Sequence, residues 1–146
     1  MPEPRFIVKR AETRAEMAGA RAVRLRVFVQ EQGVPETEEY DELDAVAHHA
    51  VALAGGSAMA TGRLIDEEPG VARIGRMAVD RAWRGRGVGS RVLAYLEGQA
   101  RSAGYRESVL HAQCDVEGFY ARFGYRPEGE PFEEAGIEHI TMRKKL

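Results

Sequence analysis

The chain has 146 residues, a length that suits one domain with a full hydrophobic core, and we expect a single domain over residues 1–146. Its formal net charge of −2 excludes the basic field that drives nucleic-acid binding, and no apolar run approaches the length of a membrane span. Cys114 is the single cysteine, which excludes an internal disulfide. Together with an N-terminus that lacks a signal-peptide pattern, it predicts a protein of the reducing cytoplasm.

A long N-terminal helix is predicted from about residue 14 to residue 32. Thr13 stands three residues before Glu16, which is the spacing of a capping box at a helix start. A break is expected before Phe28, because the run Val-Phe-Val is β-rich and poor in helix propensity. Gly33 is expected to end the helix.

Residues 36–47 are expected to form a loop that contains acidic side chains and no basic one. Two interpretations are open. The loop is a solvated surface segment, as most charge runs are, or it attracts a cationic amine to a nearby site, with Tyr40 covering a pocket. The acidic residues are Glu36, Glu38, Glu39, Asp41, Glu42 and Asp44.

Short apolar runs between turn residues predict a strand-rich first half. Residues 6–8 are expected to form an edge strand. Three further strands, joined by the two-residue turn Gly55–Gly56 and by a turn over residues 67–70, should form an antiparallel meander. These three strands are predicted at residues 48–54, 57–65 and 71–79.

Beyond residue 79 the pattern alternates between helices and strands. A helix predicted at about residues 87–103 separates the strand before it from a strand at residues 108–112, so these two strands should lie parallel. A short helix is predicted at residues 116–123, ended by Gly124. The remaining strands are expected near Tyr125, Phe132 and residues 139–143. This order of elements predicts an α+β domain.

The turn between residues 79 and 90 has the composition of an anion site. Gly87 and Gly89 carry no Cβ, so a ligand can approach their amides closely. The first amides of a helix have no intrahelical partner, and the helix dipole there favours negative charge. Arg84 and Arg86 add guanidinium groups suited to phosphate. The turn therefore predicts a diphosphate held on backbone N–H groups at a helix start.

Two sequence blocks point to a family. The turn lacks the lysine of a P-loop and the third glycine of G-x-G-x-x-G, but it matches R-x-x-G-x-G with Arg84, Gly87 and Gly89. The block F-Y-A-R-F-G-Y follows at residues 119–125. Over about residues 48–145 the chain resembles the GNAT family of N-acetyltransferases. The stretches H-A-Q, G-I-E-H-I-T-M and R-V-F-V-Q-E-Q-G resemble the ElaA/YjcF-like branch of that family.

The resemblance implies a fold and a co-substrate. The family fold is a mixed sheet of about six or seven strands flanked by about four helices, with parallel strands four and five splayed where the thioester enters. Gly75, inside the strand at residues 71–79, is expected to contribute to that irregularity through a bulge. Acetyl-CoA is the implied co-substrate, and no metal is implied.

The resemblance also implies roles for particular residues. Met77, Ala78 and Val79 would pair their backbone with pantetheine, and the amide of Ala78 or Val79 would polarise the thioester carbonyl. Tyr120 would donate a proton to the leaving thiolate, since a phenol with a pKa of about 10 is protonated at neutral pH. Gln113 stands where many members carry asparagine, which moves the amide one methylene further out. The implied cofactor-binding residues are Met77, Ala78, Val79, Arg84, Gly85, Arg86, Gly87, Val88, Gly89, Ser90, Gln113, Phe119, Tyr120 and Phe123.

The general base is left open by the sequence. His111 is the first candidate, because it lies on the strand that leads to Gln113 and Tyr120. Glu31, near the end of the first helix, is the second. A lone histidine on a strand is more often a hydrogen-bonded structural residue, and this applies to His111 as well as to His48, His49 and His139.

Taken together, the sequence predicts an N-acetyltransferase that moves an acetyl group from acetyl-CoA to a primary amine by direct attack on the thioester. A small-molecule amine, such as an amino sugar, is the expected acceptor, because the acidic loop could form a lid. Two alternatives stay open: a regulatory module that binds acyl-CoA without turnover, and a protein lysine or N-terminal acetyltransferase with an open groove. Nucleic-acid and membrane partners are not expected. Pairing through sheet edges into a homodimer fits the family.

Overall fold

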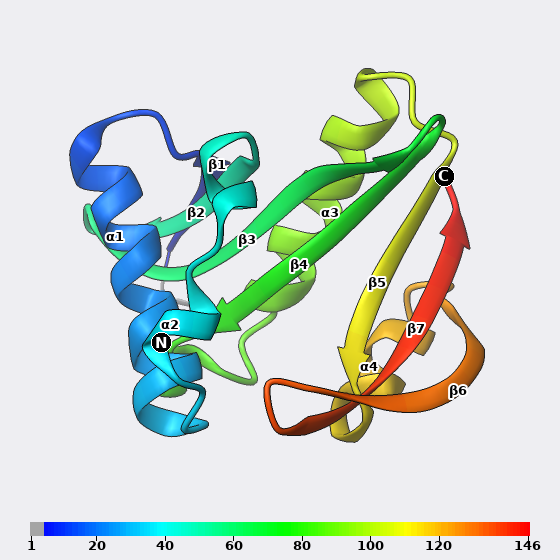
Figure 1. The fold of residues 1–146 in the computed structure, drawn as a ribbon. Coiled ribbons are helices and arrows are strands. Elements are labelled where there is room, and N and C mark those ends of the chain that lie inside the picture. Colours follow the sequence, from blue (N-terminus) through cyan, green and yellow to red (C-terminus); the bar gives the residue numbers. More distant parts are fainter. Residues whose placement is uncertain (1–4) are drawn as a thin grey trace.

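A computed structural model describes residues 5–146, and within that range the chain forms one mixed sheet of seven strands with helices packed against it (Figure 1). The strands are β1 (Ile7–Arg10), β2 (His48–Ala54), β3 (Ser57–Glu68), β4 (Val71–Val79), β5 (Glu107–Gln113), β6 (Arg126–Glu134) and β7 (Ile137–Lys145). The α-helices are α1 (Arg14–Arg24), α2 (Glu36–Glu39), α3 (Val88–Ser102) and α4 (Glu117–Ala121). The helical segments whose turns are tighter or wider than those of an α-helix are η1 (Leu25–Glu31), η2 (Glu42–Ala45), η3 (Arg81–Trp83) and η4 (Cys114–Val116). The strand order is β1-β2-β3-β4-β5-β7-β6, which is the mixed α+β arrangement predicted.

The N-terminal helix begins and ends as predicted, but its second half is wound differently. In the capping box the Glu16 amide donates to Thr13 Oγ1 (3.0 Å), and the Thr13 amide donates to Glu16 Oε1 (3.1 Å). The segment η1 is a π-helix, in which the Gln32 amide bonds to the Val27 carbonyl five residues earlier (3.0 Å). A wider turn therefore replaces the expected break. Gly33 follows with a φ of 76° and stops the helix.

The sheet buries side chains on both faces, because successive residues of a strand point to opposite sides. On β2, Val51 packs with Ala20 of α1, whereas Ala50 and Ala52 join the cluster that contains Leu93 of α3. The helices α1 and α3 therefore cover opposite faces, and α3 lies behind β3 and β4 in Figure 1. In the described part of the chain, no helix combines the length and apolar character needed to cross a membrane.

The predicted meander is present, since β2 pairs antiparallel with β3, and β3 with β4. The strand β3 is longer than predicted and runs to Glu68, because Asp66 pairs with Ala72 and Glu68 with Val71. The expected turn over residues 67–70 is therefore reduced to Pro69–Gly70.

A β-bulge interrupts β4 near its middle. Thr61 pairs with Ala78 and Arg63 with Gly75, so β4 has one more residue than β3 between these two pairs. Arg76 lies inside the bulge with a φ of 51°. Gly75 was predicted to mark an irregularity, and the bulge begins there.

The strands β4 and β5 are parallel, as predicted, but they pair over a short stretch only. Val71, Ala72 and Arg73 stand opposite residues 107–109, and beyond this point the strands part, as their arrowheads do in Figure 1. The other edge of β5 pairs with β7 over its whole length. The outer end of β5 is therefore held by the C-terminal hairpin and not by β4.

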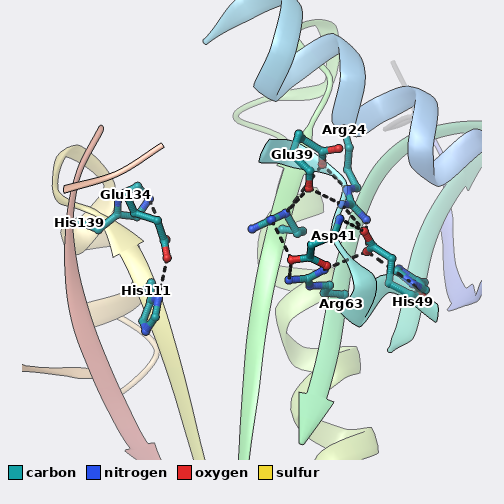
Figure 2. A network of polar contacts seen from close by, with 10 residues as sticks. Arg24, Glu39, Asp41, His49, Arg63, His111, Glu134 and His139 are labelled. Carbon is teal, nitrogen blue, oxygen red and sulfur yellow. Dashed lines mark hydrogen bonds and ion pairs between the residues drawn. The ribbon is translucent and has the colours of Figure 1, made fainter. Parts of the chain in front are cut away.

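The acidic segment at residues 36–47 is only in part the solvated loop that the sequence suggested, since Glu36, Glu38 and Glu42 are exposed. It folds into α2 and η2, and Glu39 and Asp44 are buried. Arg24 of α1 hydrogen-bonds Glu39 through Nε and Asp44 through Nη1 (2.6 Å). Arg63 of β3 adds a bond from Nη1 to Asp44 Oδ1 (2.9 Å). Figure 2 shows this network, which neutralises the acids inside the protein.

Candidate active site

A cleft of about 1140 Å³ lies where β4 and β5 part. Its walls come from both strands, from the turn that precedes α3, from α4 and from the end of η1. This volume is larger than that of most sites for drug-sized ligands. Of the residues that the sequence analysis singled out for catalysis or cofactor binding, all of which lie in the described chain, only Arg86 stays outside the lining.

The helix α3 begins at the cleft without a capping side chain. Gly87 is its N-cap residue and has a φ of 78°. The amides of the first turn therefore have no intrahelical acceptor, and the helix dipole adds partial positive charge there. The space that a Cβ on Gly89 would enter lies between the Phe119 ring (3.5 Å) and the Val79 side chain (3.7 Å). Amides without partners at a helix start that lines the cleft fit a diphosphate group.

Arg84 is held by hydrogen bonds within the protein more firmly than an arginine that is free to bind a phosphate would be. Three of its five N–H groups are used: Nε donates to the Val79 carbonyl (3.0 Å), and Nη1 and Nη2 donate to the two carboxylate oxygens of Glu31 (2.6 and 2.7 Å). These bonds lower the pKa of Glu31, which makes it a poor proton acceptor at neutral pH. Arg86 is exposed and lies over the Trp83 ring (5.2 Å).

The backbone of β4 presents Val79 to the cleft, and not Ala78. The Asp80 amide donates to the Met59 carbonyl (2.8 Å), so the flanking pair of Val79 and Ala60 is a non-hydrogen-bonded pair of the ladder. The N–H and C=O groups of Val79 therefore point away from β3, and those of Ala78 point toward it. The hydrogen bond that the Val79 carbonyl accepts from outside the sheet agrees with this direction.

Tyr120 reaches the cleft from α4. Its ring packs edge-on against Phe119 and Tyr125, with centroids 5.0 and 6.0 Å away. Burial raises the pKa of its hydroxyl to about 12, so the phenol stays protonated throughout the neutral range. Gly124, with a φ of 94°, ends the helical segment. A protonated phenol at this place can donate a proton to a leaving group.

His111 faces the cleft from β5 and forms a cluster with the C-terminal hairpin (Figure 2). Its Nδ1 lies 3.2 Å from Glu134 Oε1, and Phe132 packs edge-on against its ring (5.1 Å). His139 Nε2 lies 3.7 Å from the second oxygen of Glu134. The hydrogen bond with His111 lowers the pKa of Glu134, which favours an ionised carboxylate beside the imidazole. The cluster can therefore accept a proton from a bound amine.

Gln113 uses its amide inside the protein. Its Nε2 donates to Gln32 Oε1 (2.9 Å), just beyond η1, and the reverse contact measures 3.4 Å. Both residues line the cleft. This pair links the end of β5 to the end of the N-terminal helix beside the opening between the strands.

Two other side chains noted in the sequence analysis, Cys114 and Tyr40, have no part in this acid–base chemistry. Desolvation, followed by the nearby Glu138 carboxylate, raises the pKa of the Cys114 thiol, which disfavours a nucleophilic thiolate. Tyr40 is exposed beneath the Arg21 guanidinium (4.3 Å) and is not part of the cleft lining.

A family model described as an acetyltransferase (GNAT) domain matches residues 9–146. The chain belongs to the GNAT acetyltransferase family. It is 36% identical over 135 residues to the uncharacterized N-acetyltransferase YjcF of Bacillus subtilis (strain 168). The aligned region covers 92% of this chain and 96% of that protein. It is 33% identical over 130 residues to the protein ElaA of Escherichia coli (strain K12), which covers 85% and 84%. A solved acyl-CoA N-acyltransferase from Pseudomonas aeruginosa has a TM-score of 0.83 at 32% identity, over 96% of this chain and 98% of that one.

As a GNAT member the protein is an acyltransferase that uses an acyl-CoA and an amine, and the resemblance drawn from the sequence is confirmed. The uncapped start of α3, the outward N–H of Val79 and the protonated Tyr120 fit a GNAT co-substrate. Sequence reasoning missed Arg76 and Glu134. A signal for Glu134 was present, because the turn at Gly136 brings it to the same end of the hairpin as His139. No sequence pattern marked Arg76.

Proposed function

We propose that this GNAT protein transfers an acetyl group from acetyl-CoA to the primary amine of a small molecule by direct attack of the amine on the thioester. One observation carries the proposal: an uncapped helix start, a protonated phenol and a histidine–carboxylate pair meet in one cleft between splayed strands. Acyl transfer from a thioester to an amine requires an anion site for the carrier, a proton acceptor and a proton donor.

The start of α3 would hold the diphosphate on the amides of residues 88–90, with the dipole of a 15-residue helix behind them. Arg84 would act by fixing the turn, since it already binds Glu31 and Val79. Arg86, which is exposed beside the turn, is free to approach a phosphate. The backbone of Val79, which points away from β3, offers pairing to the pantetheine arm.

In the reaction, a C–N bond forms at the thioester carbon as the C–S bond breaks. His111, supported by Glu134, would accept the proton that the amine releases. The Val79 N–H would donate to the carbonyl oxygen as negative charge develops there. Tyr120 would transfer its proton to the departing sulfur and regain one from solvent.

Features at the edge of the cleft support a small acceptor rather than a protein. The segment α2–η2 is docked against α1 and β3 through buried ion pairs, and the Gln32–Gln113 pair borders the opening. A protein acceptor requires a groove in which an extended peptide can lie. A sensor that binds acyl-CoA without turnover has no need of the pair His111–Glu134. The lone cysteine supports a cytoplasmic location.

A thiol-release assay with acetyl-CoA, a panel of small amines and a panel of peptides tests this proposal. We expect amine-dependent release of thiol that falls by at least about tenfold in Tyr120→Phe. Turnover of peptides without turnover of free amines would replace the proposal with protein acetylation. Binding of acetyl-CoA with no acceptor-dependent release of thiol would replace it with a sensing role.

A further inference from the structure

Arg76 holds a conformation that a non-glycine residue adopts only when its surroundings enforce it. Its φ of 51° lies in the left-handed region, which costs an L-residue about 1–2 kcal/mol. The residue sits inside the β4 bulge, and its side chain lines the cleft. Such outliers gather at functional sites, where a bulge re-aims a side chain.

The guanidinium of Arg76 is partly desolvated and incompletely paired. Its Nε donates to the backbone carbonyl of Glu39 (3.1 Å), and Nη2 makes a contact of 3.3 Å with Asp41 Oδ2. The carboxylates of Glu39 and Asp41 are already bound by Arg24 and Arg63, respectively. Within residues 5–146, Nη1 of Arg76 donates no hydrogen bond.

The electrostatics agree with a cation that its neighbours compensate only in part, since Asp41 and Glu39 act against burial and two nearby arginines. Burial lowers the pKa of Arg76, and the positive charges of Arg63 and Arg24 lower it further. The hydrogen bond from His111 is the largest cause of the lowered pKa of Glu134. The positive charge of Arg76 is a smaller cause that acts in the same direction. An anion that binds Arg76 would offset the repulsion that Arg76 experiences from Arg63 and Arg24.

Arg76 and His111 flank the opening between the two strands. Parallel pairing ends with Arg73 opposite Val109, and Gly75 and His111 each lie two residues beyond this pair, where the strands part. Arg76 follows Gly75 and lines the same cleft. Figure 2 shows the arginine–carboxylate cluster on one side and the His111 cluster on the other.

We infer that the acceptor is an amino carboxylate, a small molecule that carries its reactive amine and a carboxylate within one short unit. Arg76 binds the carboxylate through Nη1 and Nη2, and His111 with Glu134 receives the amine. Arginine presents parallel N–H groups that match the two carboxylate oxygens. This inference names the substrate class of the proposed acetyltransferase and rests on that proposed function.

A cationic amine without a carboxylate is the competing ligand, and the acids beside Arg76 argue against it. Glu39 and Asp41 are neutralised by Arg24 and Arg63. Glu39 Oε2 has no hydrogen-bond partner within the described residues, but it is shielded from solvent and cannot receive an ammonium group as the side chains stand. Within this cluster the incompletely paired group is therefore Arg76, whereas Glu38 and Asp115, which also line the cleft, are exposed to solvent.

Matched pairs of probes test the inference. They are L-phenylalanine with 2-phenylethylamine, L-lysine with cadaverine, and L-histidine with histamine, so that members of a pair differ by the carboxylate. In wild type we expect kcat/KM for the best amino acid to exceed that of its partner amine by about 10- to 100-fold, the value of a charged hydrogen bond. Arg76→Gln should lose about this factor for the amino acid while leaving the amine within about twofold. Arg76→Lys should recover part of it.

Arg73→Gln is the matched control, because Arg73 lies on the same strand and is already paired with Glu67 (3.1 Å). It should leave the preference unchanged. Saturation-transfer NMR with the same amino acids and CoA reports acceptor binding without turnover. Binding that Arg76→Gln abolishes supports the inference even where turnover is absent. The inference is overturned if the partner amines are preferred, if no amino acid binds, or if Arg73→Gln and Arg76→Gln behave alike. Failure of the proposed function can be distinguished from failure of this inference. The proposed function fails if acetyl-CoA does not bind or if no amine of either kind is acetylated.

Discussion

Arg84 and Glu31 form a two-pronged ion pair, with N–O distances of 2.6 and 2.7 Å, that ties the glycine-rich turn before α3 to the end of η1. The pair gives Arg84 a role that the sequence did not predict. Its side chain positions the turn through bonds within the protein, and is not held ready for a phosphate. It also removes Glu31 from the set of strong candidates for the general base, since a carboxylate held in this way has a lowered pKa.

We therefore expect Glu31→Gln to weaken acetyl-CoA binding by several-fold while changing the free energy of unfolding by less than about 1 kcal/mol, because the pair is half-exposed. Calorimetric titration and urea unfolding measure the two quantities. Arg81→Gln is the control, since Arg81 is 81% exposed and lies 3.7 Å from Glu31. Equal affinities in wild type and Glu31→Gln would mean that the ion pair does not shape the cofactor site.

Tyr120→Phe removes the hydroxyl and keeps the packing of the ring against Phe119 and Tyr125. We expect turnover to fall by about ten- to a hundredfold or more, because the thiolate loses its proton donor, while acetyl-CoA affinity stays within about twofold. Steady-state assays and calorimetry check the two parts. Full turnover in this variant would remove Tyr120 from the mechanism.

The pair His111–Glu134 predicts a change in the pH–rate profile. His111→Ala should flatten or shift the acidic limb of kcat/KM, because the proton acceptor is lost. Glu134→Gln keeps the size of the side chain but removes the charge that stabilises a protonated His111, so the same limb should move toward lower pH. Profiles that match wild type in both variants would exclude this pair as the base.

How much the sequence predicted depended on the range of the interaction. The capping box at Thr13, the meander and the helix start at Gly87 each rest on residues close together in the chain, and local patterns indicated them. The burial of Glu39 and Asp44 could not be predicted in this way, because their partner Arg24 lies 15 and 20 residues away. The left-handed backbone at position 76 follows from the pairing of two strands, which no single stretch reveals.

The buried network predicts a large effect on stability. Arg24→Met would leave Glu39 and Asp44 without their guanidinium partner, and we expect a loss of about 3–5 kcal/mol in the free energy of unfolding. Arg26→Met is the control, since Arg26 is 44% exposed in its pair with Asp80, and it should cost at most about 1 kcal/mol. Urea unfolding compares the two. Similar small losses would show that the network is not needed for folding.

The same network predicts sensitivity to acid. Burial alone would raise the pKa of Asp44, but hydrogen bonds from Arg24 and from the Asp41 amide outweigh burial and hold this pKa well below its usual range. A carboxyl group with a lowered pKa in the folded state stabilises the fold above its unfolded pKa of about 3.9, and this contribution is lost as pH falls through the folded pKa. Stability should decline below about pH 5, and less steeply in Asp44→Asn. An unchanged slope would assign the decline to other groups.

Calorimetric titration with acetyl-CoA of wild type and of Gly87→Glu tests the central claim most directly. Glutamate at position 87 would place a negative charge where the turn is expected to hold the diphosphate. Gly70→Glu is the matched control, because Gly70 also has a positive φ (82° against 78°) but lies at the opposite end of β4. We predict micromolar binding by wild type and Gly70→Glu and no measurable binding by Gly87→Glu. Equal affinities in all three proteins, or no binding by wild type, would contradict a cofactor site at the start of α3.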